Sequence, residues 1–186
     1  RTDGRFYDNP RLVHHLDETA RDMVADLYKR FVKDGMHVLD LMSSWVSHLP
    51  ETANPGRLSG LGMNRTELEH NPLLTDIQVH DLNATPALPY ENESFDVAIC
   101  SVSVEYLTQP LKVFAEVGRV LKPGGTFVVT FSNRWFPPKV VRIWEQIHEF
   151  ERVGLVMEYF LRSDAFSNLG TYSMRRLPRP RNDKYA

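Results

Sequence analysis

The sequence predicts a doubly wound α/β fold, in which a mostly parallel sheet is covered by helices on both faces. Two segments, residues 95–102 and 126–131, are apolar almost throughout, which is typical of strands buried on both faces of a parallel sheet. A helical segment with Pro110 in its first turn lies between them, and Gly124-Gly125 supplies the turn into the second strand. Strands that alternate with helices in this way predict βαβ units.

The remaining segments continue this alternation of strands and helices. Apolar residues at helical spacing predict a leading amphipathic helix within residues 17–35. Further strands are predicted at residues 36–41, 57–63 and 77–81, and one or two final strands within 164–177. Further helices are predicted at 43–49, after Asn64, at 140–147 and, beyond Gly154, at 155–161.

Composition excludes several classes of protein. The formal net charge of −2 gives no basic surface for nucleic acid, and no apolar run approaches the ~20 residues of a membrane-spanning helix. Cys100 is the single cysteine, which rules out an intrachain disulfide and fits a reducing compartment. We therefore expect a cytoplasmic protein. Because the chain opens at Arg1 and not at Met, a transit peptide could have been trimmed, in which case we expect an organelle stroma protein.

Two stretches of sequence carry a resemblance to a known family. They read LPYENESFDVAICSVSVEYL and FAEVGRVLKPGGTFVVTFSN. With the segments around them, from about residue 38 to 166, they resemble the class I S-adenosylmethionine-dependent methyltransferases of the small-molecule "type 11" kind. The resemblance implies a Rossmann-like seven-stranded sheet with an antiparallel edge. It also implies one domain over residues 1–186, with a helical lid or cap (1–35), an α/β core (36–178) and a tail (179–186).

The loop after the first predicted strand departs from the family pattern. The family has an acid followed by a Gly-x-Gly run, whereas this chain reads VLDLMSSWVSHLP. Asp40 stands where the family acid meets the cationic amino group of the cofactor's methionine, although a carboxylate here also suits a turn cap. Met42, Ser43 and Ser44 replace the glycines, and the large Trp45 follows. Either the serines hold the cofactor in a widened loop, or the chain is a methyltransferase-like binding protein without turnover.

The resemblance implies further cofactor contacts after the second strand. Gly62 stands where the family has an acid that binds the ribose hydroxyls, and Met63 would lie against the adenine. We expect Asn64, with Glu67 as the second choice, to replace the missing ribose contact. Asn64 fits the cap of the following helix equally well, because Asn is a preferred N-cap residue.

The ends of the third and fourth strands complete the implied cofactor site. Asp81 and Leu82 match the family positions that meet the adenine amino group and pack on its ring, and Asn83 follows them. Asp81 or Asn83 also suits a side-chain-capped turn. The backbone at Ser101 is expected to line the floor beneath the transferred methyl group. Asp96 begins its strand at the opposite edge of the sheet, so we interpret it as structural.

The resembled reaction is methyl transfer from S-adenosylmethionine, which needs alignment more than a general base. No catalytic residue is assigned; the candidates for acceptor contacts are Tyr7, His14, Tyr106 and Asn133. Arg134 either binds an acidic acceptor or is solvated. No metal-ligand spacing occurs, and no nucleic-acid amino methyltransferase motif, so we expect a small-molecule acceptor and a monomer or weak homodimer. A nicotinamide-dependent oxidoreductase is disfavoured, because no G-x-G-x-x-G follows the first strand.

Overall fold

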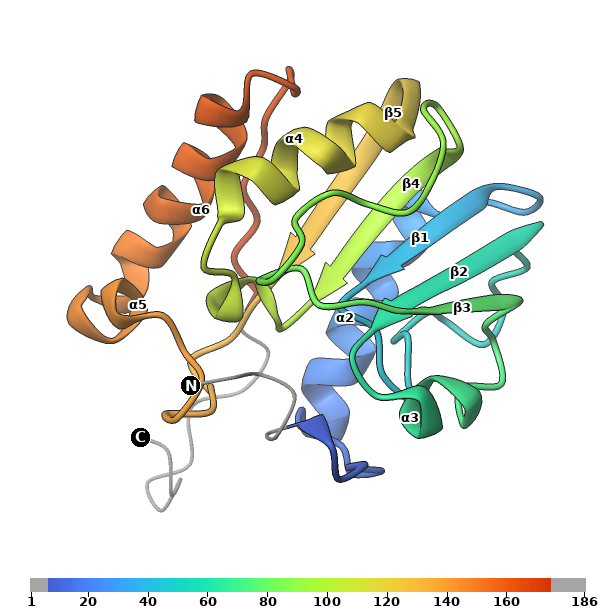
Figure 1. Ribbon diagram of the computed structural model, residues 1–186, viewed down its shortest axis with the longest axis horizontal. Helices are drawn as coiled ribbons and strands as arrows, with labels where there is room; N and C mark the ends of the chain where they lie inside the picture. The colour runs from blue at the N-terminus through green and yellow to red at the C-terminus, as the bar shows by residue number, and fades with distance from the viewer. Residues whose placement is uncertain (1–6, 175–186) are drawn as a thin grey trace.

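The computed structural model describes residues 7–174 and shows a five-stranded sheet in the order β3-β2-β1-β4-β5 (Figure 1). Every neighbouring pair of these strands is parallel, which confirms the predicted doubly wound α/β fold. The strands are β1 (His37–Leu41), β2 (Arg57–Gly62), β3 (Asp76–Val79), β4 (Phe95–Ser101) and β5 (Leu121–Thr130). The helices are α2 (Glu18–Phe31), α3 (Arg65–Glu69), η1 (Val104–Tyr106), α4 (Pro110–Val120), α5 (Arg142–Gln146) and α6 (Glu149–Ser163).

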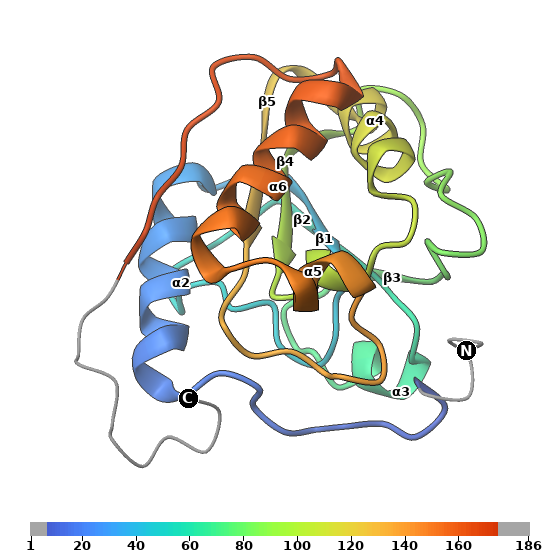
Figure 2. The same ribbon diagram turned by 90° about the vertical axis from the view of Figure 1, so that its left-hand side faces the viewer.

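Alternation along the strands divides the core into two layers, one on each face of the sheet. Val38, Leu58 and Ile99 pack with Val24 and Tyr28 of α2. Their sequence neighbours point to the other face, where the buried cluster combines residues of β1, β4 and β5 with residues of α4 and α6. Figure 2 shows α2 on one side of the sheet and α4 and α6 on the other. Both faces are therefore covered, as the continuous apolar strands require.

The predicted antiparallel edge is the main difference from expectation. Residues 164–174 form no strand, although one or two strands were predicted within 164–177. The last three of those residues, and the tail 179–186, lie outside the described residues. Phe166 instead packs on Phe127 and Phe160, with ring centroids 5.8 and 5.1 Å apart. This segment contacts the core through its side chains, so the described sheet has five strands where the family resemblance implied seven.

Two predicted helices also differ. Residues 43–49 form no helix, because Ser43 and Ser47 use their hydroxyl groups in hydrogen bonds with Asp40 and Asn71. Side-chain hydrogen bonds of this kind compete with helix formation. Gly154 does not divide the last helix, which runs unbroken through α6 from a capping box at His148. None of the described helices is long and apolar enough to cross a membrane.

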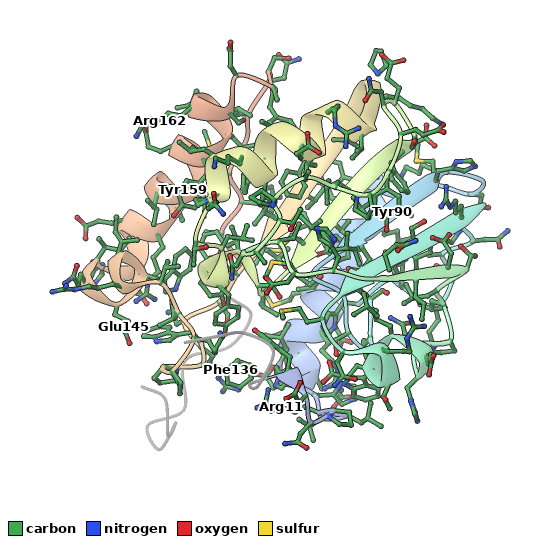
Figure 3. The ribbon with its side chains drawn as sticks, viewed as in Figure 1. Arg11, Tyr90, Phe136, Glu145, Tyr159 and Arg162 are labelled. Atoms are coloured by element: carbon green, nitrogen blue, oxygen red, sulfur yellow. The ribbon has the colours of Figure 1, made fainter. Side chains whose placement is uncertain are left out.

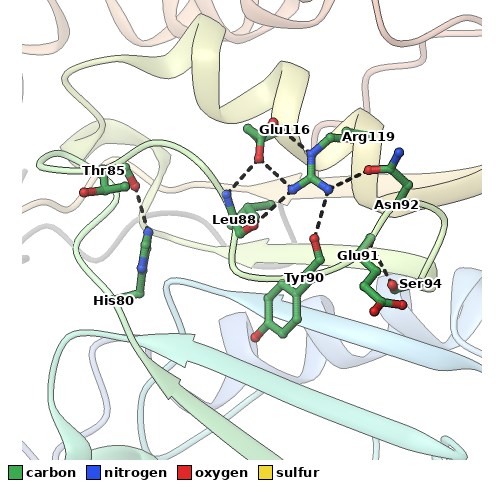
Figure 4. Close-up of polar contacts among 9 residues, drawn as sticks. All are labelled: His80, Thr85, Leu88, Tyr90, Glu91, Asn92, Ser94, Glu116 and Arg119. Carbon is green, nitrogen blue, oxygen red and sulfur yellow. Dashed lines mark hydrogen bonds and ion pairs between the residues drawn. The ribbon is translucent and has the colours of Figure 1, made fainter.

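The loop before β4, which carries the family-like LPYENES sequence, is held by Arg119 of α4. The Arg119 guanidinium donates hydrogen bonds to the carbonyl oxygens of Leu88 and Tyr90, at 3.0 and 2.9 Å (Figure 4). It also pairs with Glu116 at 2.7 Å, and Glu116 in turn accepts a hydrogen bond from the Leu88 N–H. This network lies at the amino end of β4. Asp96, at the same edge, accepts hydrogen bonds from the His37 N–H and from Lys122.

Candidate active site

A cavity of about 620 Å³ lies where β1, β2, β3 and β4 reach their carboxyl ends. Parallel α/β sheets bind ligands at this edge, and the volume is that of an ordinary small-molecule site. Every residue predicted to contact the cofactor lines this cavity. They are Asp40, Met42, Ser43, Ser44, Gly62, Met63, Asn64, Asp81, Leu82, Asn83 and Ser101. The topology therefore brings together residues that are spread over 62 positions from Asp40 to Ser101.

Asp40 combines the two roles that the sequence left open. Its side chain is buried, accepts a 2.6 Å hydrogen bond from the Ser43 hydroxyl and also lines the cavity. Burial raises the pKa of Asp40 to about 6, and hydrogen bonds from Ser43 and Ser47 oppose that rise. Among residues 7–174 no basic side chain forms an ion pair with it. Because a buried carboxylate is stabilised by a cation, this site favours a positively charged ligand group.

Gly62 explains how a loop poor in glycine fits against the sheet. The loop is anchored to β2 by a 2.7 Å hydrogen bond from the Ser43 N–H to the Leu61 carbonyl oxygen. A methyl group placed on Gly62 would lie only 2.2 Å from the Ser43 carbonyl oxygen. Close approach of two backbones at this point therefore requires glycine on β2. The acid that the family carries at this position has no room here, since Ser43 occupies the space.

The two large side chains of this loop leave the cavity open. Trp45 is not among the cavity-lining residues: its indole N–H donates to the Val13 carbonyl oxygen at 3.3 Å. Its ring also packs on His14, with centroids 4.7 Å apart. Met42 lines the cavity and adopts a φ of 58°, which L-residues rarely take. The bend after β1 is thus made by Met42 in the left-handed region, where the family uses glycine.

Asn64 and Glu67 have structural partners as well as positions on the cavity wall. The Asn64 side chain caps α3 by accepting from the Glu67 N–H, and its amide donates to the Tyr7 carbonyl oxygen at 2.7 Å. Glu67 accepts hydrogen bonds from the Arg11 N–H at 2.7 Å and from the Ser44 hydroxyl at 2.6 Å. Together they join the loop after β1 to the N-terminal segment. A ribose contact by either side chain would have to share these bonds.

The end of β3 is shaped by a side-chain-capped turn. Asp81 accepts hydrogen bonds from the N–H groups of Asn83 and Ala84, at 2.9 and 3.2 Å. The Asn83 amide donates to the Tyr106 carbonyl oxygen and its own oxygen accepts from the Thr108 N–H. Asp81 thus forms the turn and also lines the cavity, and Asn83 ties this turn to the segment after β4.

Of the four candidate acceptor contacts, Tyr7, His14 and Tyr106 line the cavity and Asn133 does not. The Asn133 amide instead donates to the Glu149 carboxylate at the start of α6. The Tyr106 hydroxyl accepts a 2.9 Å hydrogen bond from the Phe136 N–H, which holds the loop after β5 against η1. Burial raises the pKa of Tyr7 to about 12, so its hydroxyl group stays protonated.

Several lining residues were missed or set aside in the sequence. Arg11, His48 and Phe136 line the cavity although no motif marks them, and so does His80, which lies within the strand predicted at residues 77–81. Burial lowers the pKa of His48 to about 4, so its imidazole is neutral at physiological pH. These side chains are far apart in the sequence, and they meet because the parallel strands all end at the same edge of the sheet. Within residues 7–174 no group of three or more acidic, histidine or cysteine side chains could hold a metal ion.

Glu105 is buried and does not line the cavity. Neither of its carboxylate oxygens has a hydrogen-bond partner among the described residues, and burial raises its pKa to about 8. The buried Arg152 of α6 lies close enough to oppose that rise. The Glu105 carbonyl oxygen accepts a 2.9 Å hydrogen bond from the Val141 N–H, so its backbone helps to fix the segment that leads into α5.

Comparisons with known proteins agree with this geometry. Residues 59–129 match the family model of a methyltransferase domain. The chain is 30% identical over 172 residues to the biotin biosynthesis bifunctional protein BioHC of Teredinibacter turnerae. That alignment covers 77% of this chain and 30% of that protein. It is 48% identical over 122 residues to the sterol 4-C-methyltransferase strm-1 of Caenorhabditis elegans, covering 61% of this chain and 36% of that protein. The chain thus spans about a third of the length of these curated relatives.

Solved structures share the fold at lower identity. The [4+2]-cyclase SpnF superposes with a TM-score of 0.58 at 18% identity, over 87% of this chain and 71% of its own. An S-adenosylmethionine-dependent methyltransferase from Mesorhizobium loti superposes with a TM-score of 0.53 at 17% identity, over 75% of this chain and 78% of its own. The match over residues 59–129 thus identifies a methyltransferase domain in this chain, and the solved structures show that it has the fold of S-adenosylmethionine-dependent methyltransferases.

Proposed function

We propose that this protein binds S-adenosylmethionine in the cavity at the carboxyl ends of β1–β4 and transfers its methyl group to a small-molecule acceptor. The observation that carries the proposal is the convergence of every predicted cofactor residue on one cavity of about 620 Å³. A cavity of this size accommodates a nucleoside with an amino-acid side arm. The open loop after β1, with Trp45 turned away, supports the same conclusion.

The charges on the cavity wall fit the cofactor. Asp40 is a buried carboxylate without a basic partner among residues 7–174, and the cofactor's methionine end carries an ammonium group that would supply one. The Ser43 hydroxyl group bonds to Asp40, and Ser44, whose hydroxyl group bonds to Glu67, lines the same cavity. Leu82 is a buried apolar residue beside the capped turn at Asp81, which suits the face of an adenine ring. These residues would hold the two ends of the molecule.

Bound S-adenosylmethionine supplies an activated methyl group, so the protein's own task is positioning. The floor at Ser101 is fixed by a 2.6 Å hydrogen bond between its hydroxyl group and that of the buried Tyr28. The N-terminal segment and the loop after β5 cover the site, joined by contacts of Arg11 and His15 with Phe136. Alignment of donor and acceptor in a water-poor site is the main source of rate in such a transfer.

The proposal extends to the organisation of the chain. We infer one domain that works as a monomer or weak homodimer. Of the predicted cap (1–35), the segment before α2 lines the cavity and would cover the cofactor, whereas α2 packs on a face of the sheet. A reducing compartment, the cytoplasm or an organelle stroma, is supported by Cys100, which is buried and unpaired.

Calorimetric titration tests the proposal. We expect S-adenosylmethionine and S-adenosylhomocysteine to bind with micromolar affinity and NADH to give no heat. Transfer of a tritiated methyl group into a metabolite extract would then separate an enzyme from a binding protein without turnover. Failure of both sulfur compounds to bind at millimolar concentration would contradict the proposal.

A further inference from the structure

Hydroxyl groups from α2, β4 and β5 meet behind the carboxyl end of the sheet. The Tyr28 hydroxyl oxygen of α2 lies 2.6 Å from the Oγ of Ser101, at the end of β4. The Oγ1 of Thr130, at the end of β5, lies 3.5 Å from the same Tyr28 oxygen. Ser101 lines the cavity and is partly exposed, whereas Tyr28 is fully buried and is not among the lining residues. Tyr28 therefore acts on a ligand through Ser101.

The two contacts of Tyr28 fix the direction of its hydrogen bond. A fully buried phenol has to donate its proton to a protein oxygen, because no water reaches it. The 2.6 Å contact with Ser101 has the length of a good O–H···O bond, whereas 3.5 Å to Thr130 is beyond the usual range. Burial raises the pKa of Tyr28, and the nearby Asp40 carboxylate raises it further, so the phenol keeps its proton. Tyr28 is therefore the donor and the Ser101 Oγ is the acceptor.

This direction decides what the Ser101 hydroxyl group offers to the cavity. Within residues 7–174 the Ser101 side chain forms a hydrogen bond with Tyr28 alone. Its oxygen already accepts the Tyr28 proton, so its own proton remains for a ligand. A serine hydroxyl group in this state acts first as a donor, and the ligand atom that it binds must carry a lone pair.

The backbone next to Ser101 is held in an unusual conformation. Val102 follows with a φ of 42°, which a β-branched residue rarely adopts. The Val102 N–H donates to the Thr130 carbonyl oxygen, and the Ser103 hydroxyl group donates to the Ser101 carbonyl oxygen, both at 2.8 Å. Such conformations persist where the surrounding structure imposes them, and they are most frequent at functional sites. The Ser101 hydroxyl group is thus presented from a fixed floor.

The charge near this floor limits which ligand atom fits. Asp40 lies on β1 beside β4, where it is paired with Ile99, and its carboxylate acts on Tyr28. A ligand anion at Ser101 would be repelled by that carboxylate. An uncharged oxygen, of a carbonyl or a hydroxyl group, accepts the Ser101 proton without this repulsion.

We propose that Ser101 is a specificity-determining residue that donates a hydrogen bond to an uncharged oxygen of the methyl acceptor, and that Tyr28 is the positioning residue that sets this direction. The inference rests on the proposed function, because it assigns the ligand atom above the floor to the acceptor. It narrows the acceptor to a molecule with a carbonyl or hydroxyl oxygen at or beside the atom that receives the methyl group.

Three uncharged bicyclic probes of similar shape test the direction on the protein saturated with S-adenosylhomocysteine. 1-Indanone carries only an acceptor group, indole carries only a donor group, and indane carries neither. We expect 1-indanone to bind about fivefold tighter than indane, which is the gain from one net hydrogen bond, and indole to bind no tighter than indane. Ligand-observed NMR titration measures the three affinities.

Variants separate positioning from structural support. Tyr28→Phe releases the Ser101 oxygen, so the preference for 1-indanone over indane should fall by about threefold and indole should bind more tightly. A merely structural role of Tyr28 would weaken the three probes equally. Ser101→Ala should abolish the preference, and adding Tyr28→Phe to it should change the ratio no further. Tyr159→Phe is the matched control, because Tyr159 is buried on α6, on the other face of the sheet (Figure 3).

The outcomes separate the inference from the function on which it rests. Equal affinity for 1-indanone and indane, tighter binding of indole, or no binding of 1-indanone would overturn the inference even if S-adenosylhomocysteine binds. If Tyr28→Phe did not fold, an unchanged preference in Ser101→Ala would overturn it, and a lost preference would support it. Failure of the wild-type protein to bind S-adenosylhomocysteine, with 1-indanone still preferred, would overturn the methyltransferase proposal and leave the Ser101 donor site standing.

Discussion

The two edges of the sheet are organised in contrasting ways. At the amino edge, one side chain, Arg119, bonds to two backbone carbonyl groups and fixes the loop before β4. At the carboxyl edge, the loop after β1 is fixed by short side chains that bond to one another, with Ser43 on Asp40 and Ser44 on Glu67. The most family-like sequence, LPYENES and LKPGG, lies at the amino edge, and the cavity lies at the other. The amino edge therefore keeps the family's sequence pattern, whereas the loop after β1 at the carboxyl edge departs from it and is fixed by its own side chains.

The largest expected effect comes from breaking the contact that lets the carboxyl edge form. Gly62→Ala places a methyl group 2.2 Å from the Ser43 carbonyl oxygen, so the loop after β1 must leave its position. We expect the free energy of unfolding to fall by about 3 kcal/mol, the upper end for overpacking, and S-adenosylhomocysteine binding to be lost. Chemical denaturation and calorimetry measure both.

Gly154→Ala is the matched control for this substitution. Gly154 lies inside α6, and a methyl group there meets no atom within 4 Å. Replacing a helical glycine by alanine should raise the free energy of unfolding by about 0.5–1 kcal/mol. Equal free energies of unfolding for the two variants would contradict our claim that the close approach of Gly62 to the loop after β1 requires glycine.

The second effect concerns the buried carboxylate of the carboxyl edge. Burial raises the pKa of Asp40 to about 6, above its ordinary value of 3.8 in the unfolded chain. Between these two values the folded protein binds more protons than the unfolded one, so the cost of the buried charge grows as pH rises from about 4 to about 6. Above pH 6 the cost is complete and amounts to at most about 3 kcal/mol.

Asp40→Asn removes this cost and, with it, the carboxylate that we assign to the cofactor. We expect the variant to be more stable than the wild type at pH 7, with the difference vanishing near pH 4. Its affinity for S-adenosylhomocysteine should fall about tenfold, because the ammonium group loses an ionic partner. Unfolding curves from pH 4 to 8 would contradict the account if the difference were independent of pH.

A smaller effect is expected at the amino edge. Arg119→Ala removes the hydrogen bonds to Leu88 and Tyr90 and the ion pair with Glu116, which are partly exposed. We expect a loss of about 2 kcal/mol of unfolding free energy, as for a few charge-assisted hydrogen bonds. Affinity for S-adenosylhomocysteine should stay within about twofold of the wild type. A large loss of affinity in the folded variant would show that the two edges are coupled.

The smallest effect is expected at Trp45. Its indole N–H makes one 3.3 Å hydrogen bond to the Val13 carbonyl oxygen, and its side chain lies outside the cavity. Trp45→Phe keeps the ring and removes the donor, so stability should change by less than about 1 kcal/mol. Calorimetry should give S-adenosylhomocysteine affinity within about twofold of the wild type. A marked gain in affinity would mean that this side chain obstructs the site in solution.

The same contrast explains what the sequence can predict. Apolar runs such as residues 95–102 set the strands, and strand order follows from βαβ connections, so the architecture and the edge that holds the cavity are predictable. The sequence-based predictions fail where the local structure depends on side chains that are distant in the sequence. The loop at residues 43–49 is not helical because Ser47 bonds to Asn71, which lies 24 positions away. Asn133 follows β5 but turns to Glu149, and nothing in its local sequence indicates that partner.

Gly62 shows the same limit within the site. The sequence shows that Gly62 replaces the acid of the family. It does not show why glycine is required there, because the Ser43 carbonyl oxygen that leaves no room for a side chain comes from the loop after β1. Asp40, Asp81 and Asn64 line the cavity, and each also accepts a hydrogen bond within the turn or helix that follows it. Each residue therefore has the position expected for a cofactor contact and also the position expected for a local cap. Whether each contacts the cofactor stays a prediction.

Mapping of amide NMR shifts during titration with S-adenosylhomocysteine tests the central claim most directly. The account predicts large shifts at Leu41, Gly62, Leu82 and Ser101, at the carboxyl edge, and none at Leu88 or Asn92 beside Arg119. Shifts confined to the amino edge, or no shifts at millimolar ligand, would contradict a cofactor site built on the serine-containing loop.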